Sequence, residues 1–243
     1  MSGIRCVNPL MAMATPSDHA QTMDHSDLIR HVVVLGHPIP GSFNHQVADV
    51  YCDTVRACGQ EVILRDLYAT GFNPLLKPEE RRDPKSPTSS TDVIGELAAL
   101  ENVRALVFIY PVWFGSPPAI IKGYVDRVLG AGFGVRAVRS GEAHPLLAGA
   151  RLITFSSSAT TVPWLKDRGH IALRQAFDNY LITVFAMREA FCTHFDAIID
   201  GLHERSVLEK LEATRQEAVR ICTILDQERD HRTLHPAAWP DDR

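Results

Sequence analysis

Five stretches of strand length, each followed after a loop by a helical pattern, constrain the fold of this chain more than any other feature. They lie at residues 31–35, 61–67, 105–110, 151–155 and 188–195. Chains that alternate strands with helices form a parallel sheet with helices on both faces. The pattern predicts one doubly wound α/β domain over residues 30–226, preceded by a flexible extension at 1–29 and followed by a tail at 227–243. Within the domain it predicts a polar, proline-rich loop from Lys77 to Thr91 and a closing amphipathic helix from His203 to Leu225.

Composition excludes several classes of protein. The net charge of −4 lacks the basic excess of a nucleic-acid-binding protein. No apolar run reaches the roughly 20 residues of a transmembrane segment, and the N-terminus lacks the pattern of a secretory signal. The five cysteines form no CxxC pair, which is typical of reduced thiols in a cytoplasmic protein. The eleven histidines lack the spacing of a metal site.

The stretch from Tyr110 to Leu129 contains the clearest candidate site. It turns at a proline, crosses an aromatic loop at 112–116 and enters an amphipathic helix near Ala119 through two further prolines, which suit the first turn of a helix. An aromatic loop at the carboxyl end of a buried parallel strand lies where open α/β sheets bind ligands. The alternative is that Trp113 and Phe114 are aromatic residues of the core or of a dimer interface.

The loop after the first strand has the composition of an anion site. Ser42 and Asn44 stand between a strand and the start of a helix, where free N–H groups and the helix dipole favour a phosphate. Capping of the helix would explain the same two residues. The loop matches neither GxGxxG nor GxxxxGK[ST], which disfavours a nicotinamide-binding Rossmann domain and a P-loop NTPase.

Two motifs make the chain resemble the flavodoxin-like NAD(P)H:quinone oxidoreductases, the DT-diaphorase-like flavoproteins. The first, H-x-x-x-x-S-F-N, begins at His37. The second is close to P-x-x-W-F/W-G-x-P-A-I-L-K-G-W/Y-x-D/E-R-V and extends from Pro111 to Val128. The resemblance covers roughly residues 30–225. It implies a flavodoxin-like sheet of five parallel strands in the order 2-1-3-4-5, with the ligand at the switch point beside strand 1.

The resemblance implies a bound flavin, FAD or FMN with FAD slightly favoured, and NAD(P)H as co-substrate. In the family a T-T-G-G loop after the fourth strand wraps the N1/O2 edge of the flavin, and here Ser158 and Ala159 replace the glycines. Backbone N–H groups at 112–115 and 157–159 would then face that edge. The residues implied to hold the flavin are His37, Ser42, Phe43, Asn44, Pro111, Val112, Trp113, Phe114, Gly115, Ser156, Ser157, Ser158 and Ala159.

Catalytic and substrate-binding residues are implied as well. In the quinone reductases a Tyr and a His stabilise the reduced flavin and relay a proton, and Trp164 and His170 hold these positions here. An indole donates a hydrogen bond but has no hydroxyl that titrates. Phe133, Val135 and Ala137 fall on the wall of the substrate pocket, where some members present two tyrosines. This departure predicts a more open, less aromatic pocket.

The predicted function is a flavin-dependent NAD(P)H oxidoreductase. It would pass a hydride from NAD(P)H through flavin N5 to a quinone or similar acceptor by a ping-pong mechanism. The alternatives are an azo- or nitro-compound reductase and a regulatory flavoprotein subunit of a potassium-efflux system. An electron-transfer flavodoxin ranks last, because those proteins are shorter and more acidic. The family pairs its subunits around the flavin, so the resemblance implies a homodimer with sites at the interface and a small-molecule acceptor.

Overall fold

The computed structural model describes residues 28–81, 90–131, 145–160 and 169–234. Its parallel sheet has five strands in the order β2-β1-β3-β4-β5, which confirms the predicted fold class. The strands are β1 (Arg30–Leu35), β2 (Glu61–Asp66), β3 (Val103–Pro111), β4 (Arg151–Ser157) and β5 (Arg188–Phe195). The helices are α1 (Phe43–Ala57), α2 (Pro78–Arg81), α3 (Thr91–Ala99), α4 (Ala119–Tyr124), α6 (His170–Leu173), α7 (Asn179–Val184) and α8 (Glu204–Leu234). A π-helical turn, η2 (Val125–Leu129), extends α4, another, η5 (Arg174–Asp178), joins α6 to α7, and a 3₁₀ turn, η3 (Pro145–Leu147), precedes β4.

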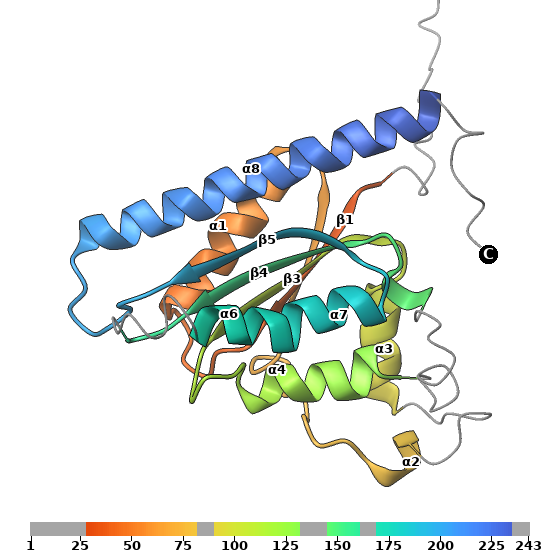
Figure 1. The fold of residues 1–243 in the computed structure, drawn as a ribbon, viewed down its shortest axis with the longest axis horizontal. Coiled ribbons are helices and arrows are strands. Elements are labelled where there is room, and N and C mark those ends of the chain that lie inside the picture. Colours follow the sequence, from red (N-terminus) through yellow and green to blue (C-terminus); the bar gives the residue numbers. More distant parts are fainter. Residues whose placement is uncertain (1–27, 82–89, 132–144, 161–168, 235–243) are drawn as a thin grey trace, which may run out of the picture.

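Helices cover both faces of the sheet (Figure 1). α1 and α8 pack on one face, and α3, α4, α6 and α7 pack on the other. Nearly every residue of β1 and β3 is buried, which explains why both strands read as continuous apolar runs in the sequence. No helix in the described part of the chain is both long and apolar enough to cross a bilayer.

The strand register brings the ends of four strands to one edge of the sheet. Leu35 of β1 pairs with Ile109 of β3. Two residues further along β3, Pro111 pairs with Ser157 of β4, which in turn pairs with Phe195 of β5. The loops after these strands therefore emerge side by side at the carboxyl edge, where open parallel sheets bind ligands.

Two glycines allow α4 to lie unusually close to its neighbours. A Cβ atom on Gly36, at the end of β1, would lie 2.6 Å from Cγ1 of Ile121 in α4. A Cβ atom on Gly123, in α4 itself, would lie 2.4 Å from the carbonyl oxygen of Pro74. Real Cβ contacts are never this short, so both positions require glycine for packing. The close approach fixes where α4 begins and therefore where the preceding loop lies.

A short helix, α2, lies within the segment that was predicted as a loop from Lys77 onward, so that prediction was wrong at 78–81. The cause is Arg127 of η2, whose side chain is fully buried. Its guanidinium donates to the Glu80 carboxylate at 2.7 and 3.0 Å and to Asp92 at 2.8 and 3.1 Å. The pKa of Glu80 is lowered to about 2, mainly by the hydrogen bonds from Arg127. This contact joins residues far apart in the sequence.

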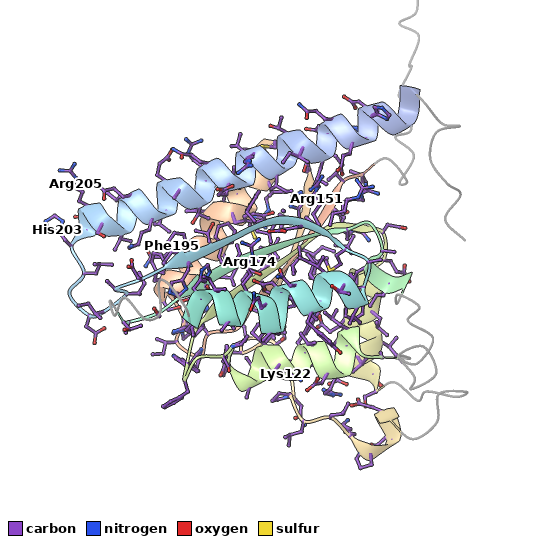
Figure 2. All side chains as sticks on the ribbon, in the orientation of Figure 1. Lys122, Arg151, Arg174, Phe195, His203 and Arg205 are labelled. Atoms are coloured by element: carbon purple, nitrogen blue, oxygen red, sulfur yellow. The ribbon has the colours of Figure 1, made fainter. Side chains whose placement is uncertain are left out.

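Helix α8 continues past its predicted end at Leu225. The carboxylate of Glu228 forms ion pairs with Arg104, Arg151 and Arg188, which stand near the starts of β3, β4 and β5. Arg151 lies between α8 and the sheet in Figure 2. The ion pairs hold the last turns of α8 against the sheet, although the sequence there is mostly polar.

The two glycines in helices α4 and α3 are expected to respond in opposite ways to the same substitution. Gly123→Ala should lower the free energy of unfolding by about 1–3 kcal/mol, because its methyl group would overlap the backbone of Pro74. Gly95→Ala in α3 should raise it by about 0.5–1 kcal/mol, because the site is open and alanine is the better helix former. Urea unfolding of both variants tests this. Changes of the same sign would contradict the packing argument.

Candidate functional site

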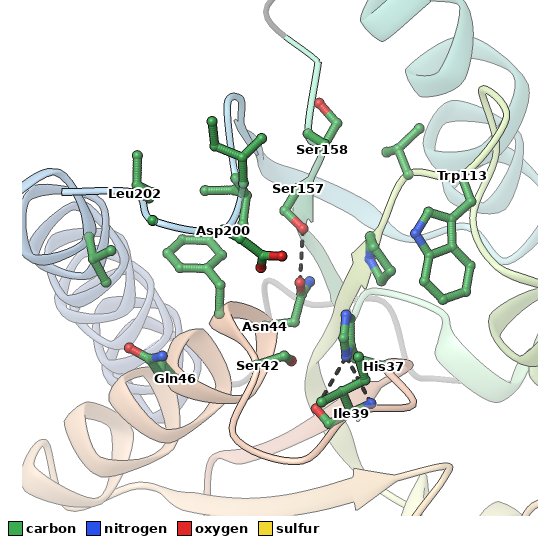
Figure 3. A pocket seen from close by; sticks show the side chains of 18 residues that line it. His37, Ile39, Ser42, Asn44, Gln46, Trp113, Ser157, Ser158, Asp200 and Leu202 are labelled. Atoms are coloured by element: carbon green, nitrogen blue, oxygen red, sulfur yellow. Dashed lines mark hydrogen bonds between the residues drawn. The ribbon is translucent and has the colours of Figure 1, made fainter. Parts of the chain in front are cut away.

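A cavity of about 540 Å³ opens at the carboxyl edge of the sheet (Figure 3). Four loops line it, those after β1, β3, β4 and β5, together with the first turns of α1. The lining therefore comes from segments far apart in the sequence that the parallel strands place side by side. The predicted flavin-binding residues that line it are His37, Ser42, Phe43, Asn44, Pro111, Val112, Trp113, Ser157, Ser158 and Ala159.

The loop after β1 presents polar side chains whose partners lie within the protein. Nδ1 of His37 accepts the N–H of Ile39 at 3.1 Å, and burial lowers the pKa of His37. Ser42 occupies the N-cap position of α1 but makes no side-chain capping bond; its hydroxyl lies 2.8 Å from Nδ1 of His45. The simple capping interpretation of Ser42 was therefore wrong. The first residues of α1, whose N–H groups have no partners within a helix, line the cavity.

The loop after β3 forms a tight turn. The N–H and C=O groups of Trp113 and Ser116 bond each other at 3.0 and 3.1 Å. Phe114 and Gly115 between them have φ of +51° and +78°, as a type I′ turn requires. Trp113 faces the cavity, but the Phe114 side chain is fully exposed and does not line it. Gly115 lines a second, apolar cavity of about 450 Å³ between this loop and the helical segment from α6 to η5.

Several backbone donors that were expected to face a flavin are engaged elsewhere. The N–H of Val112 donates to the carbonyl of Ser157 at 2.7 Å, and that of Ser158 donates to Phe195 at 2.9 Å. The N–H of Trp113 closes the turn described above. The expectation that the whole segment 112–115 presents free N–H groups was therefore wrong. Within the described residues the N–H groups of Phe114 and Gly115 keep no protein partner.

The serines after β4 are tied to neighbouring strands and helices. The Ser157 hydroxyl donates to Oδ1 of Asn44 at 2.8 Å, which joins this loop to the start of α1. The hydroxyls of Ser156 and Ser158 lie 2.9 and 3.0 Å from the two ring nitrogens of His194 on β5. Ser156 is buried beneath the cavity and does not line it. The half-buried imidazole of His194 thus holds the segment in which Ser158 and Ala159 stand where the resemblance implies glycines.

His170, predicted to be catalytic, begins α6 and does not line the cavity. Its Nε2 lies 3.5 Å from Sγ of Cys192, and its ring centroid lies 5.4 Å from that of His194. Burial is the main cause that lowers the pKa of His170. The other predicted residues of catalysis and substrate binding, Trp164, Phe133, Val135 and Ala137, lie outside the described residues and stay predictions.

Sequence reasoning missed one wall of the cavity. The loop after β5, residues 198–202, closes it on the side of α8, and the carboxylate of Asp200 points into it (Figure 3). Neither a glycine pattern nor an aromatic cluster distinguishes this loop in the sequence. Only its position after the fifth strand could have indicated that it lines the cavity. In the described part of the chain, no group of three His, Cys, Asp or Glu side chains could hold a metal.

Comparisons with known proteins agree with this geometry. Residues 30–187 match a family described as having a flavodoxin-like fold. The chain is 30% identical to an uncharacterized NAD(P)H oxidoreductase from Haemophilus influenzae, over 58% of this chain and 70% of that protein. It is 31% identical to NAD(P)H dehydrogenase [quinone] 1 from Rattus norvegicus, over 43% of this chain and 44% of the rat protein. The chain thus spans less than half the length of that relative.

Solved structures have the same fold. An NAD(P)H:quinone oxidoreductase from Methanothermobacter marburgensis superposes with a TM-score of 0.65 at 20% identity, over 79% of this chain and 98% of the other. An FMN-dependent NADH-azoreductase from Bacillus anthracis, in complex with FMN, superposes with a TM-score of 0.55 at 14% identity, over 80% and 100%. At these identities the likeness shows the fold alone.

Substitution of His194 should change how stability depends on pH. Burial is the main cause that lowers the pKa of His194 from 6.5 to about 4. The unfolded chain therefore takes up a proton at a higher pH than the folded chain, and wild-type stability should fall as pH drops from about 6.5 to about 4. His194→Gln should remove the contribution of His194 to this dependence of the free energy of unfolding on pH. Urea unfolding at several pH values measures it, and parallel curves for both proteins would contradict the assignment.

Proposed function

The chain belongs to the family of flavodoxin-like NAD(P)H oxidoreductases, and from that membership we propose that it is a flavin-dependent enzyme that reduces a quinone or a similar small acceptor. A bound flavin would supply the hydride chemistry, in which N5 would serve as the hydride carrier between NAD(P)H and the acceptor in a ping-pong sequence. The protein binds and orients the reactants and excludes water.

The observation that carries this proposal is the cavity at the carboxyl edge. Its volume of about 540 Å³ falls in the range of small-molecule sites. The start of α1 offers unpaired N–H groups and the positive end of a helix dipole, which suit a phosphate. Trp113, Pro111 and Val112 form an apolar wall for a planar ring. A flavin needs both of these features at opposite ends of one site, and the residues present fit it.

The residues that line the site would then have different roles, according to where each one lies. Ser42 and the first N–H groups of α1 would hold the phosphate. The bond from Ser157 to Asn44 keeps the loops after β1 and β4 at a fixed separation, so the binding site is formed before any ligand enters. The N–H groups of Phe114 and Gly115 stand beyond the apolar wall, where they could donate to the polar edge of a ring or to the acceptor.

The extent of the cavity favours FAD. Its lining includes the loop at 198–202 and Val207 of α8 in addition to the start of α1, where a phosphate would bind. Asp200 on that loop has a carboxylate that could accept hydrogen bonds from the ribose hydroxyls of an adenosine. FMN, which ends at its phosphate, would leave this part of the cavity to water.

We propose a homodimer in which the partner covers the second cavity. That cavity is lined mainly by small and apolar residues of the loop after β3 and of the segment 169–177. Phe114, Ile171 and Tyr180 are more than half exposed among the described residues. Exposed apolar groups beside an open apolar cavity are typical of a surface that a partner buries. His170, next to Gly169 in the cavity wall, would act at this boundary, where the acceptor enters.

The flavin should be visible in the purified protein. We expect a yellow protein whose released cofactor is FAD, whose flavin absorbance bleaches when NADH or NADPH is added, and whose colour returns with a quinone. Recovery with an azo dye but not with a quinone would favour the azoreductase alternative. A flavin that binds but is not reduced by either nucleotide would favour a regulatory subunit. Failure to bind FAD or FMN on reconstitution would contradict the proposal.

The apolar wall can be tested by a matched pair of substitutions. Trp113→Ala should weaken flavin binding about tenfold, a loss of about 1.4 kcal/mol, because it removes the large side chain of the wall. Ile94→Ala is the control, since Ile94 is exposed to a similar degree but lies on α3, away from the cavity. Flavin affinity is measured from the change in flavin fluorescence. Equal effects of the two substitutions would show that Trp113 does not contact the ring.

A further inference from the structure

Three side chains form a row of hydrogen bonds behind the start of α1. The Ser42 hydroxyl lies 2.8 Å from Nδ1 of His45, and Nε2 of His45 lies 3.3 Å from Oδ2 of Asp66 at the end of β2. His45 and Asp66 are largely buried, with 15% and 20% of their side chains exposed. Of the three, Ser42 lines the cavity, and the other two lie behind it.

The direction of these hydrogen bonds follows from Asp66. Its Oδ1 accepts the backbone N–H groups of Tyr68 and Ala69, both at 3.1 Å. An ionised carboxylate only accepts hydrogen bonds. Nε2 of His45 must therefore carry a proton and donate it to Oδ2. In a neutral imidazole the other nitrogen, Nδ1, is then an acceptor. It takes the hydroxyl proton of Ser42.

The charge on His45 consequently decides what Ser42 can offer to a ligand. With neutral His45, the Ser42 hydrogen points away from the cavity, and the oxygen presents lone pairs that repel an anion. With cationic His45, Nδ1–H donates to the Ser42 oxygen, and the hydroxyl hydrogen is free to donate into the cavity. A proton on His45 thus turns Ser42 from an acceptor into a donor for a phosphate.

The described lining of the cavity carries no permanent positive charge. None of the described residues that line it is a lysine or an arginine, and Asp200 adds a negative charge. The titratable groups that face His45 from neighbouring elements are Asp66 and His37, whose ring centroid lies 6.1 Å away. Burial lowers the pKa of His37, so its imidazole is neutral near pH 7. His45, which contacts Ser42 directly, is therefore the side chain that can supply a positive charge behind the predicted phosphate position.

We propose that His45, held by Asp66, is the positioning residue of the phosphate subsite, and that a phosphate-bearing cofactor binds together with a proton taken up at His45. The inference rests on the proposed flavin site. It assigns the counter-charge of the phosphate to an imidazole, in place of an arginine or lysine. Because binding favours the protonated form of His45, affinity falls as pH rises through the range in which imidazoles titrate.

The experiment measures FAD affinity by fluorescence for the wild type, His45→Gln and Asp66→Asn at about pH 6 and about pH 8.5, on either side of the imidazole range. The FAD diphosphate keeps its charge across this range, so a change in affinity comes from the protein. Riboflavin, which has the same ring system but no phosphate, is the control ligand. It also reports whether each variant still forms the remainder of the site.

We expect wild-type affinity for FAD to fall about tenfold between the lower and the higher pH. His45→Gln should bind FAD weakly at both values, with no more than about a twofold change, and its riboflavin affinity should equal that of the wild type. Asp66→Asn, which keeps an acceptor for the Tyr68 and Ala69 N–H groups, should also lose most of the pH dependence. An equal pH dependence in wild type and His45→Gln would overturn the proposal.

A second measurement separates this proposal from that of the flavin site. Inorganic phosphate is added to the wild-type protein while NMR follows the imidazole signal of His45, assigned by its loss in His45→Gln. Phosphate should shift the titration of that signal to higher pH. If FAD and riboflavin both fail to bind but phosphate causes the shift, the flavin assignment fails and the phosphate subsite stands. A titration that phosphate leaves unchanged would overturn the subsite.

Discussion

The close approach of α4 to the sheet is the constraint on which the site depends. Gly36 and Gly123 remove the side chains that would hold α4 away from β1 and from Pro74. With α4 fixed, the short link from β3 to α4 must turn sharply, and it does so at Phe114 and Gly115 with positive φ. Trp113 then faces the cavity. The position of this wall of the binding site therefore depends on how α4 packs against its own face of the sheet.

Polar contacts between neighbouring strands complete what packing begins. The described residues 156–160, at the end of β4 and just after it, contain no glycine and are held by side chains. Ser157 bonds to Asn44 of α1, and His194 of β5 holds Ser156 and Ser158 with its two ring nitrogens. Each bond joins segments that are distant in the sequence. Hydrogen bonds from α1 and β5 thus hold a segment where the resemblance implies glycines, which have greater conformational freedom.

The sequence predicted what depends on local patterns. The strands β1, β3 and β4 read as apolar runs because they are buried. The strand order was implied by the resemblance, and the sheet confirms it. What failed depended on distant contacts: helix α2 forms because Arg127 reaches Glu80, and α8 is extended by the arginines around Glu228. The outward side chain of Phe114 and the cavity wall at 198–202 were likewise outside the reach of a local pattern, because each requires knowing which loops become neighbours.

The charged groups that stabilise the fold differ in kind from the group proposed to bind the ligand. The buried guanidinium of Arg127 is charged at every pH that the fold survives, so its ion pairs with Glu80 and Asp92 give a constant contribution to packing. At the cavity the described lining contains no such permanent cation. An imidazole behind Ser42 gains its charge when an anion arrives and loses it when the anion leaves. The empty site therefore needs no buried positive charge, and the cost of desolvating one arises only when a ligand is present to offset it.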